Sequence, residues 1–173
     1  DETLNVREMS WAELRDQTQR AAQALRAMGV QPGDRVAAYL PNIPEALIAL
    51  LATASIGAIW SSCSPDFGVQ GVLDRFQQIE PKVLLGVTGY AYNGKWHDRR
   101  LALAELAGAL PSIEQRLIVI DDASMLPDAK HWRETLEHAR ALISLGAQGC
   151  FQVLQQATGG QLVDKGVHVA DVE

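Results

Sequence analysis

The sequence predicts an α/β fold, a mainly parallel sheet flanked by helices. Short apolar runs of strand length alternate with longer segments in which apolar residues recur at helical spacing. Glycine and proline residues mark the boundaries between the two kinds of segment. The clearest example, residues 36–68, combines a strand, a covering helix and a second buried strand, which is the unit that builds parallel sheets.

The first predicted helix and strand lie in the N-terminal part of the chain. Ser10 and Glu13 match a capping box, and apolar residues then recur at helical spacing until Gly29 ends the run. After a turn at residues 31–34, the apolar run 36–40 predicts a strand that is covered on both faces.

The second helix opens at Pro44, because proline in a first turn loses no hydrogen bond. We expect Asn42 to cap this helix and Gly57 to end it. Residues 58–63 then predict the second strand.

The third helix starts at Asp66 or Gly68 and ends at Pro81. For Asp66 we favour a capping role, since a carboxylate is stabilised at a helix N-terminus. Residues 83–87 predict the third strand.

Residues 89–98, GYAYNGKWHD, predict a loop, and their tyrosines, tryptophan and lysine are unusual in a plain connection. Apolar spacing over residues 101–110 predicts a helix, and residues 117–120 predict a fourth strand. After a loop that contains Pro127, residues 132–143 predict a last helix.

Composition and net charge exclude several classes of protein. A chain of 173 residues that is 47% hydrophobic and 21% charged can bury a proper core. Its net charge of -6 argues against nucleic acid or an anionic membrane as a partner, and no apolar run is long enough to cross a bilayer. Cys63 and Cys150 are too far apart for a disulfide framework or a metal site, so we expect a cytoplasmic protein without a resident metal.

The chain divides into two parts by composition. Residues 1–140 carry the predicted elements and form a partial domain. Residues 141–173 are rich in Gln and Gly, lack strong periodicity and form a tail of unknown nature. The first residue is Asp rather than Met, so we expect a piece of a longer protein.

Three long stretches identify a family. They are MSWAELRDQTQRAAQALRAMGVQPGDRVAAYLPNIPEALIALLATASIGAIW, SSCSPDFGVQGVLDRFQQIEPKVLL and GYAYNGK. Together they closely resemble the N-terminal region of adenylate-forming acyl-CoA synthetases over residues 9–121. The SSCSPDFG and GYAYNGK stretches are more similar to the branch that acts on acetoacetate than to the branch that acts on acetate, which has a glycine-rich element at residues 64–66.

The resemblance implies an AMP-forming acid–thiol ligase. ATP and acetoacetate, or another short carboxylate, form an acyl-adenylate and diphosphate, and the thiol of coenzyme A (CoA) then displaces AMP. Mg²⁺ is implied with ATP. The family's phosphate-binding loop, S-G-T-T-G-x-P-K, is missing from these residues, and the nearest match, Thr158 to Gly160 with Lys165, has the wrong spacing.

We therefore expect the N-terminal part of a ligase that is not catalytically complete alone. The alternative is a stand-alone, non-catalytic ligand-binding or interaction domain derived from that family. Because the rest of the domain normally packs against this region in the family, we also expect uncovered apolar surface and self-association.

The resemblance places the CoA contacts in two segments. They are the turn after the second strand, with Ser64, Pro65 and Asp66, and the loop after the third, with Tyr92, Lys95 and the following Arg99. Both segments leave the carboxyl end of a parallel sheet, where ligands of open α/β sheets bind. No catalytic residue is predicted within the chain.

Two interpretations of this second segment stay open. Lys95, Arg99 and Arg100 either contact the phosphates of CoA or form a solvated basic loop. At Lys95 and Tyr92 the related enzymes place arginines, and neither residue reproduces a bidentate guanidinium. The aromatic residues of the loop either stack on adenine or pack on the neighbouring strand.

Overall fold

Five parallel strands form the main sheet, in the order β2-β1-β3-β6-β7. The computed structural model describes residues 7–119 and 128–139. All of them belong to the first of two compact units, Asp1–Ala139 and Arg140–Glu173. The elements are α1 (Trp11–Ala27), β1 (Arg35–Tyr39), α2 (Pro44–Ser55), β2 (Ile59–Cys63), α3 (Val69–Ile79), β3 (Val83–Gly86), β4 (Gly89–Tyr92), β5 (Lys95–Asp98), α4 (Arg100–Ala109), β6 (Gln115–Ile118) and β7 (Ala129–His131).

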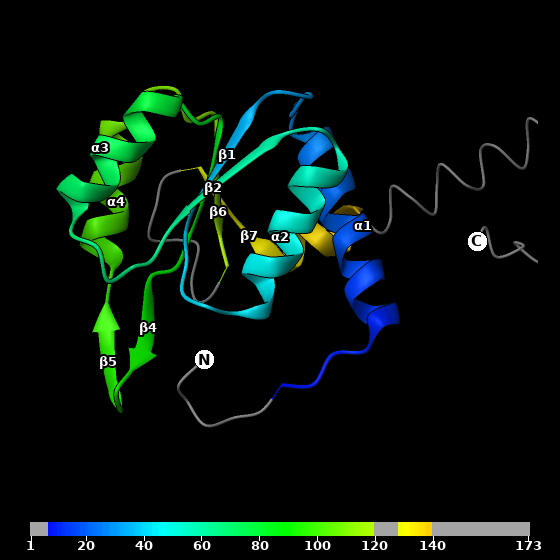
Figure 1. Cartoon of the computed structure of the whole chain (residues 1–173), viewed down its shortest axis with the longest axis horizontal. Helices are drawn as coiled ribbons and strands as arrows, with labels where there is room; N and C mark the ends of the chain where they lie inside the picture. The colour runs from blue at the N-terminus through cyan, green and yellow to red at the C-terminus, as the bar shows by residue number, and fades with distance from the viewer. Residues whose placement is uncertain (1–6, 120–127, 140–173) are drawn as a thin grey trace, which may run out of the picture. The chain divides into compact units, whose positions relative to one another are not determined.

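Helices cover both faces of this sheet. Figure 1 shows α1 and α2 on one side and α3 and α4 on the other. Strand β1 alternates accordingly: Val36 and Ala38 belong to the core beneath α1 and α2, whereas Ala37 and Tyr39 belong to the core beneath α3 and α4. The parallel sheet with flanking helices that the sequence predicts is therefore confirmed.

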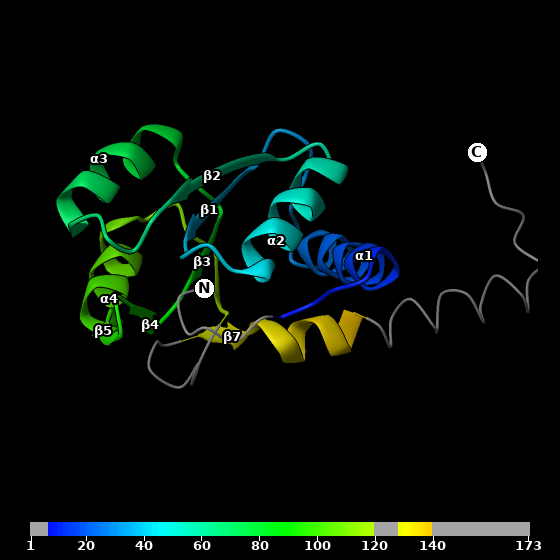
Figure 2. The ribbon, with the colours of Figure 1, turned by 60° about the horizontal axis from the view of Figure 1, so that its bottom comes forward.

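The end of the described region extends the predicted sheet. Strand β7 pairs with β6 and was not predicted, because its three residues carry no apolar run. Strand β6 begins at Gln115, two residues before the predicted start at Leu117. Residues 132–139 are helical as predicted, and Trp132 lies in the same core as α1 and α2. Figure 2 shows this helix near α1. Residues 140–143 of the prediction lie outside the described residues.

Two predicted helix caps are wrong. The N-cap of α2 is Ile43, with no side-chain hydrogen bond, and Asn42 lies one position too early. Pro44 at the first helical position sets the helix start without a polar cap. The N-cap of α3 is Gly68, so Asp66 does not cap that helix. The capping box of Ser10 and Glu13 at α1 is confirmed.

Residues 89–98 form an antiparallel hairpin rather than the predicted loop. Strands β4 and β5 pair through this stretch, and Asn93 and Gly94 turn the chain with φ values of 49° and 69°. Two successive positive φ values belong to the turn that matches the twist of a two-residue hairpin. In Figure 1 the hairpin projects away from the sheet.

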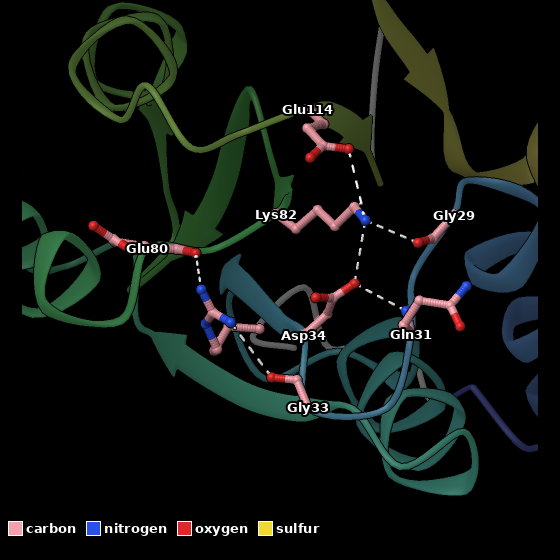
Figure 3. A network of polar contacts seen from close by, with 8 residues as sticks. Gly29, Gln31, Gly33, Asp34, Glu80, Lys82 and Glu114 are labelled. Carbon is pink, nitrogen blue, oxygen red and sulfur yellow. Dashed lines mark hydrogen bonds and ion pairs between the residues drawn. The ribbon is translucent and has the colours of Figure 1, made fainter.

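A polar network closes the amino end of the sheet. Figure 3 shows Lys82, which precedes β3, donating to the carbonyl of Gly29 at 2.9 Å and to the carboxylate of Asp34 at 3.2 Å. The Arg35 guanidinium reaches the other way, to the carbonyls of Ile79 at 2.6 Å and Glu80 at 2.9 Å. The carbonyls of Ile79 and Glu80 lie at the end of α3, where a helix leaves carbonyls unpaired, so this edge has a structural role.

Candidate functional site

The two segments predicted to bind a ligand leave the same edge of the sheet. Strands β1, β2 and β3 are parallel and adjacent, so their carboxyl ends lie together. The turn of residues 64–67 follows β2, and the hairpin of residues 89–98 follows β3. The β1 strand lies between them in the sheet. This is the edge at which open α/β sheets bind ligands.

The turn after β2 is held from beneath by Tyr39 at the end of β1. The buried Tyr39 hydroxyl lies 3.0 Å from the carbonyl of Pro65 and 3.2 Å from that of Phe67. Burial raises the pKa of Tyr39, which keeps its phenol protonated and able to donate. Within the turn, the Ser64 hydroxyl donates to Asp66 at 2.8 Å. The backbone of residues 64–67 is thus fixed before any ligand arrives.

Tyr90 joins the hairpin to that turn. Its hydroxyl donates a hydrogen bond to the Asp66 carboxylate. Hydrogen bonds from Tyr90 and Ser64, and the nearby positive charge of Arg99, lower the pKa of Asp66. Burial and the same carboxylate raise the pKa of Tyr90. Asp66 is therefore ionised at neutral pH, and Tyr90 remains a donor.

Arg99 also links the hairpin of residues 89–98 to the turn of residues 64–67. Its Nε donates to the carbonyl of Pro65 at 2.7 Å, and one terminal nitrogen lies 3.4 Å from the Tyr90 hydroxyl. The guanidinium carbon sits 5.4 Å from the centre of the Tyr90 ring. The Arg99 backbone N–H also closes the hairpin base on the Thr88 carbonyl at 2.7 Å. The other terminal nitrogen of the guanidinium donates to the Asp98 carbonyl at 3.2 Å. The guanidinium therefore contacts the protein at four points and offers a ligand only its remaining donors.

Tyr92 and Lys95 lie at the tip of the hairpin. They pair across it, as Tyr90 pairs with His97, so these four side chains share one face of the ribbon. Tyr90 and His97 stack with ring centroids 5.3 Å apart, and Tyr92 meets His97 edge-on at 6.2 Å. Tyr92 is 47% exposed, and within the described residues the Lys95 ammonium has no hydrogen bond or ion pair.

The structure thus separates the six predicted residues into two groups. Ser64, Pro65, Asp66 and Arg99 meet at the base of the hairpin, through Tyr90 and Tyr39. Tyr92 and Lys95 lie two residues further along the ribbon, about 7 Å away at the usual rise of a strand. Trp96, on the opposite face, packs over Gly89, which leaves no room for a side chain there.

Sequence reasoning missed Tyr90 and Tyr39 as links to the turn. Tyr90 was considered only for stacking or packing, and its hydrogen-bond partner Asp66 lies 24 positions earlier in the chain. Tyr39 reads as one more apolar residue of a buried strand. Local patterns carry no signal for a pairing between separate turns, so only the fold reveals it.

The arrangement suits binding rather than covalent catalysis. The Ser64 hydroxyl donates a hydrogen bond to the carboxylate of Asp66, whose pKa is lowered. A carboxylate with a lowered pKa is too weak a base to deprotonate a hydroxyl nucleophile. The described residues contain no group of three or more His, Cys, Asp or Glu side chains that could hold a metal ion. What the edge offers is an exposed ammonium, an aromatic face and a rigid turn.

Comparisons with known proteins identify the family. The model of the AMP-binding enzymes matches residues 3–157. The acetoacetyl-coenzyme A synthetase of Rhizobium meliloti is 62% identical over 90 residues, which is 52% of this chain and 14% of that protein. The acetoacetyl-CoA synthetase of Rattus norvegicus is 51% identical over 115 residues, 66% of this chain and 17% of that protein.

A solved structure agrees with these relatives. The acetoacetyl-CoA synthetase from Streptomyces lividans superimposes with a TM-score of 0.70 at 48% identity, covering 75% of this chain and 20% of that one. The chain therefore spans a fifth or less of the length of these relatives. On the match over residues 3–157, the chain belongs to the family of AMP-binding enzymes.

Proposed function

We propose that this chain is the N-terminal part of an AMP-forming acetoacetate–CoA ligase, which converts acetoacetate, ATP and CoA to acetoacetyl-CoA, AMP and diphosphate. The observation that carries this is the identity of 48% to 62% to acetoacetyl-CoA synthetases. The free thiol of buried Cys63 fits the cytoplasm, which we infer as its location.

We infer that the carboxyl edge of the sheet contacts the nucleotide end of CoA. The Lys95 ammonium is the charge available for a phosphate there, and the exposed ring of Tyr92 lies across the ribbon from it. Ser64, Pro65 and Asp66 form the floor of this surface. The charge of Asp66 is balanced by hydrogen bonds and by Arg99, which reduces its repulsion of a phosphate.

We further propose that these 173 residues do not complete the reaction. The S-G-T-T-G-x-P-K loop that holds the phosphates of ATP in the family does not occur in the sequence. Because Mg²⁺ is usually bound by one or two carboxylates together with the phosphates of its substrate, its site would be expected beside that phosphate-binding loop.

The test compares this chain with the product of the complete reading frame that contains it. We expect acetoacetate-dependent release of diphosphate from ATP, and CoA-dependent release of AMP, only from the longer product. Diphosphate release by the 173-residue chain would refute its incompleteness. A longer product inactive with acetoacetate but active with another short carboxylate would correct the acyl substrate, and one inactive with every carboxylate would refute the ligase.

A stand-alone, non-catalytic binding or interaction domain is the second candidate. One observation favours it: helices cover both faces of the sheet, so the described residues have the two cores that an independent domain needs. A reading frame that stops after Glu173, together with binding of CoA without diphosphate release, would support this candidate over the first.

A further inference from the structure

Tyr90 links the hairpin of residues 89–98 to the turn of residues 64–67. Its hydroxyl donates to Asp66, and its ring and hydroxyl contact Arg99, which in turn holds the Pro65 carbonyl. The Tyr90 side chain is 6% exposed, whereas Tyr92 on the same face is 47% exposed. Tyr90 is therefore placed to hold the hairpin, not to meet a ligand directly.

We propose that Tyr90 is a positioning residue, which fixes the hairpin against the turn of residues 64–67 so that Lys95 and the turn face one ligand. This rests on the proposed contact with CoA.

The geometry supports this role in two ways. A two-stranded ribbon is marginally stable in isolation, so its orientation depends on contacts at its base. In the register of β4 and β5, Tyr90 and Lys95 occupy the same face, and that face is the one that meets Asp66. Any tilt of the ribbon at Tyr90 moves the Lys95 ammonium at the tip.

The main test is Tyr90→Phe, which removes one hydroxyl and keeps the ring. In amide hydrogen exchange of the 173-residue chain, we expect residues 89–98 to exchange about tenfold faster, while amides of β1 and β3 keep their rates. Ser112→Ala is the matched control, since it removes a single hydroxyl bond of 2.9 Å to the Pro81 carbonyl at the amino edge. It should leave the hairpin unchanged.

A double-mutant cycle distinguishes loss of the Tyr90–Asp66 hydrogen bond from a general destabilisation of the hairpin. If Tyr90 and Asp66 act through one hydrogen bond, Asp66→Ala accelerates exchange as Tyr90→Phe does, and the double variant is no faster than either single one. Asp66→Asn keeps an acceptor and should restore most of the protection. Additive effects, or unchanged hairpin exchange in Tyr90→Phe, would overturn the proposal.

Calorimetric titration with CoA tests what the junction positions. We expect the wild-type chain to bind CoA, Tyr90→Phe to bind it about fivefold to tenfold more weakly, and Ser112→Ala to bind it as the wild type does. Equal affinity of Tyr90→Phe and wild type would refute the positioning role. If the wild type binds no CoA while the exchange results hold, the proposed CoA contact is wrong and the junction remains a structural element only.

Discussion

The Lys82 ammonium lies 3.2 Å from a carboxylate oxygen of Asp34 and 2.9 Å from the carbonyl of Gly29. Lys82 precedes β3, Asp34 precedes β1, and Gly29 follows α1, so one side chain joins three elements at the amino edge (Figure 3). The Gln31 backbone N–H and then Lys82 lower the pKa of Asp34. This edge is built for stability, and the opposite edge carries the candidate site.

Replacing Lys82 by Met should lower the free energy of unfolding by about 1–2 kcal/mol, because the Gly29 carbonyl loses its donor and the Asp34 carboxylate keeps only the Gln31 backbone N–H. Urea unfolding measures the change. Lys95→Met, at the exposed hairpin tip, is the control and should change stability by less than about 0.5 kcal/mol. Equal effects of the two variants would contradict the structural role of Lys82.

The Asp98 carboxyl should titrate with a pKa of about 2, because the Arg100 side chain and backbone N–H donate to it. Since this pKa lies below the ordinary value, the contribution of Asp98 to stability is present above about pH 4 and is lost as the pH falls toward 2. The side-chain carboxyl carbon in an NMR titration reports the midpoint.

Arg100→Gln should raise the pKa of Asp98 only part of the way to the ordinary value for Asp, since the backbone N–H of residue 100 still donates to the carboxylate at 2.9 Å. Arg26→Gln, in the last turn of α1, is the control and should leave the Asp98 titration unchanged. A wild-type midpoint at the ordinary value for Asp would contradict the ion pair.

Two Gly→Ala substitutions should act in opposite directions. Gly94 has φ +69° in the hairpin turn, so Gly94→Ala should destabilise the protein by about 1 kcal/mol although the space around it is open. Gly108 lies in α4 with open space and no positive φ, so Gly108→Ala should stabilise by about 0.5–1 kcal/mol. Thermal unfolding of both variants measures the two changes in stability. Stabilisation by Gly94→Ala would contradict the positive φ of Gly94 in the hairpin turn.

Self-association should depend on α2. The side chains of Leu47, Leu50 and Leu51 are 48%, 37% and 38% exposed, and Ile59 on the neighbouring edge strand β2 is 52% exposed. We propose that this apolar surface associates between copies of the isolated chain. Leu47→Glu with Leu51→Glu should raise the dissociation constant at least about tenfold in sedimentation velocity.

Leu101→Glu is the control for that surface, because Leu101 is 88% exposed on α4 on the other side of the sheet. It should leave sedimentation unchanged. A wild-type chain that remains monomeric at high concentration would refute the association, and equal effects of the α2 and α4 variants would place the contact elsewhere.

Part of the candidate site could be read from the sequence. The turn after β2 and the segment after β3 follow from the parallel pattern and the family resemblance. The hairpin was also within reach, because Asn93-Gly94 is the strongest short signal for a two-residue hairpin turn, but its aromatic and polar flanks hid the alternation. The wrong caps at Asn42 and Asp66 show that a polar residue near a helix start does not fix which residue caps it.

The sequence by itself determined the family, the burial of both sheet faces and the order of helices and strands in residues 11–118 except for the hairpin of residues 89–98, because periodicity and long residue matches are local properties of a chain. The tertiary structure alone decided that β3 lies beside β1, that β7 extends the sheet, and that Tyr90 meets Asp66. These are contacts between residues distant in the chain, and a hydrophobic pattern records only that a residue is buried, not which neighbour buries it.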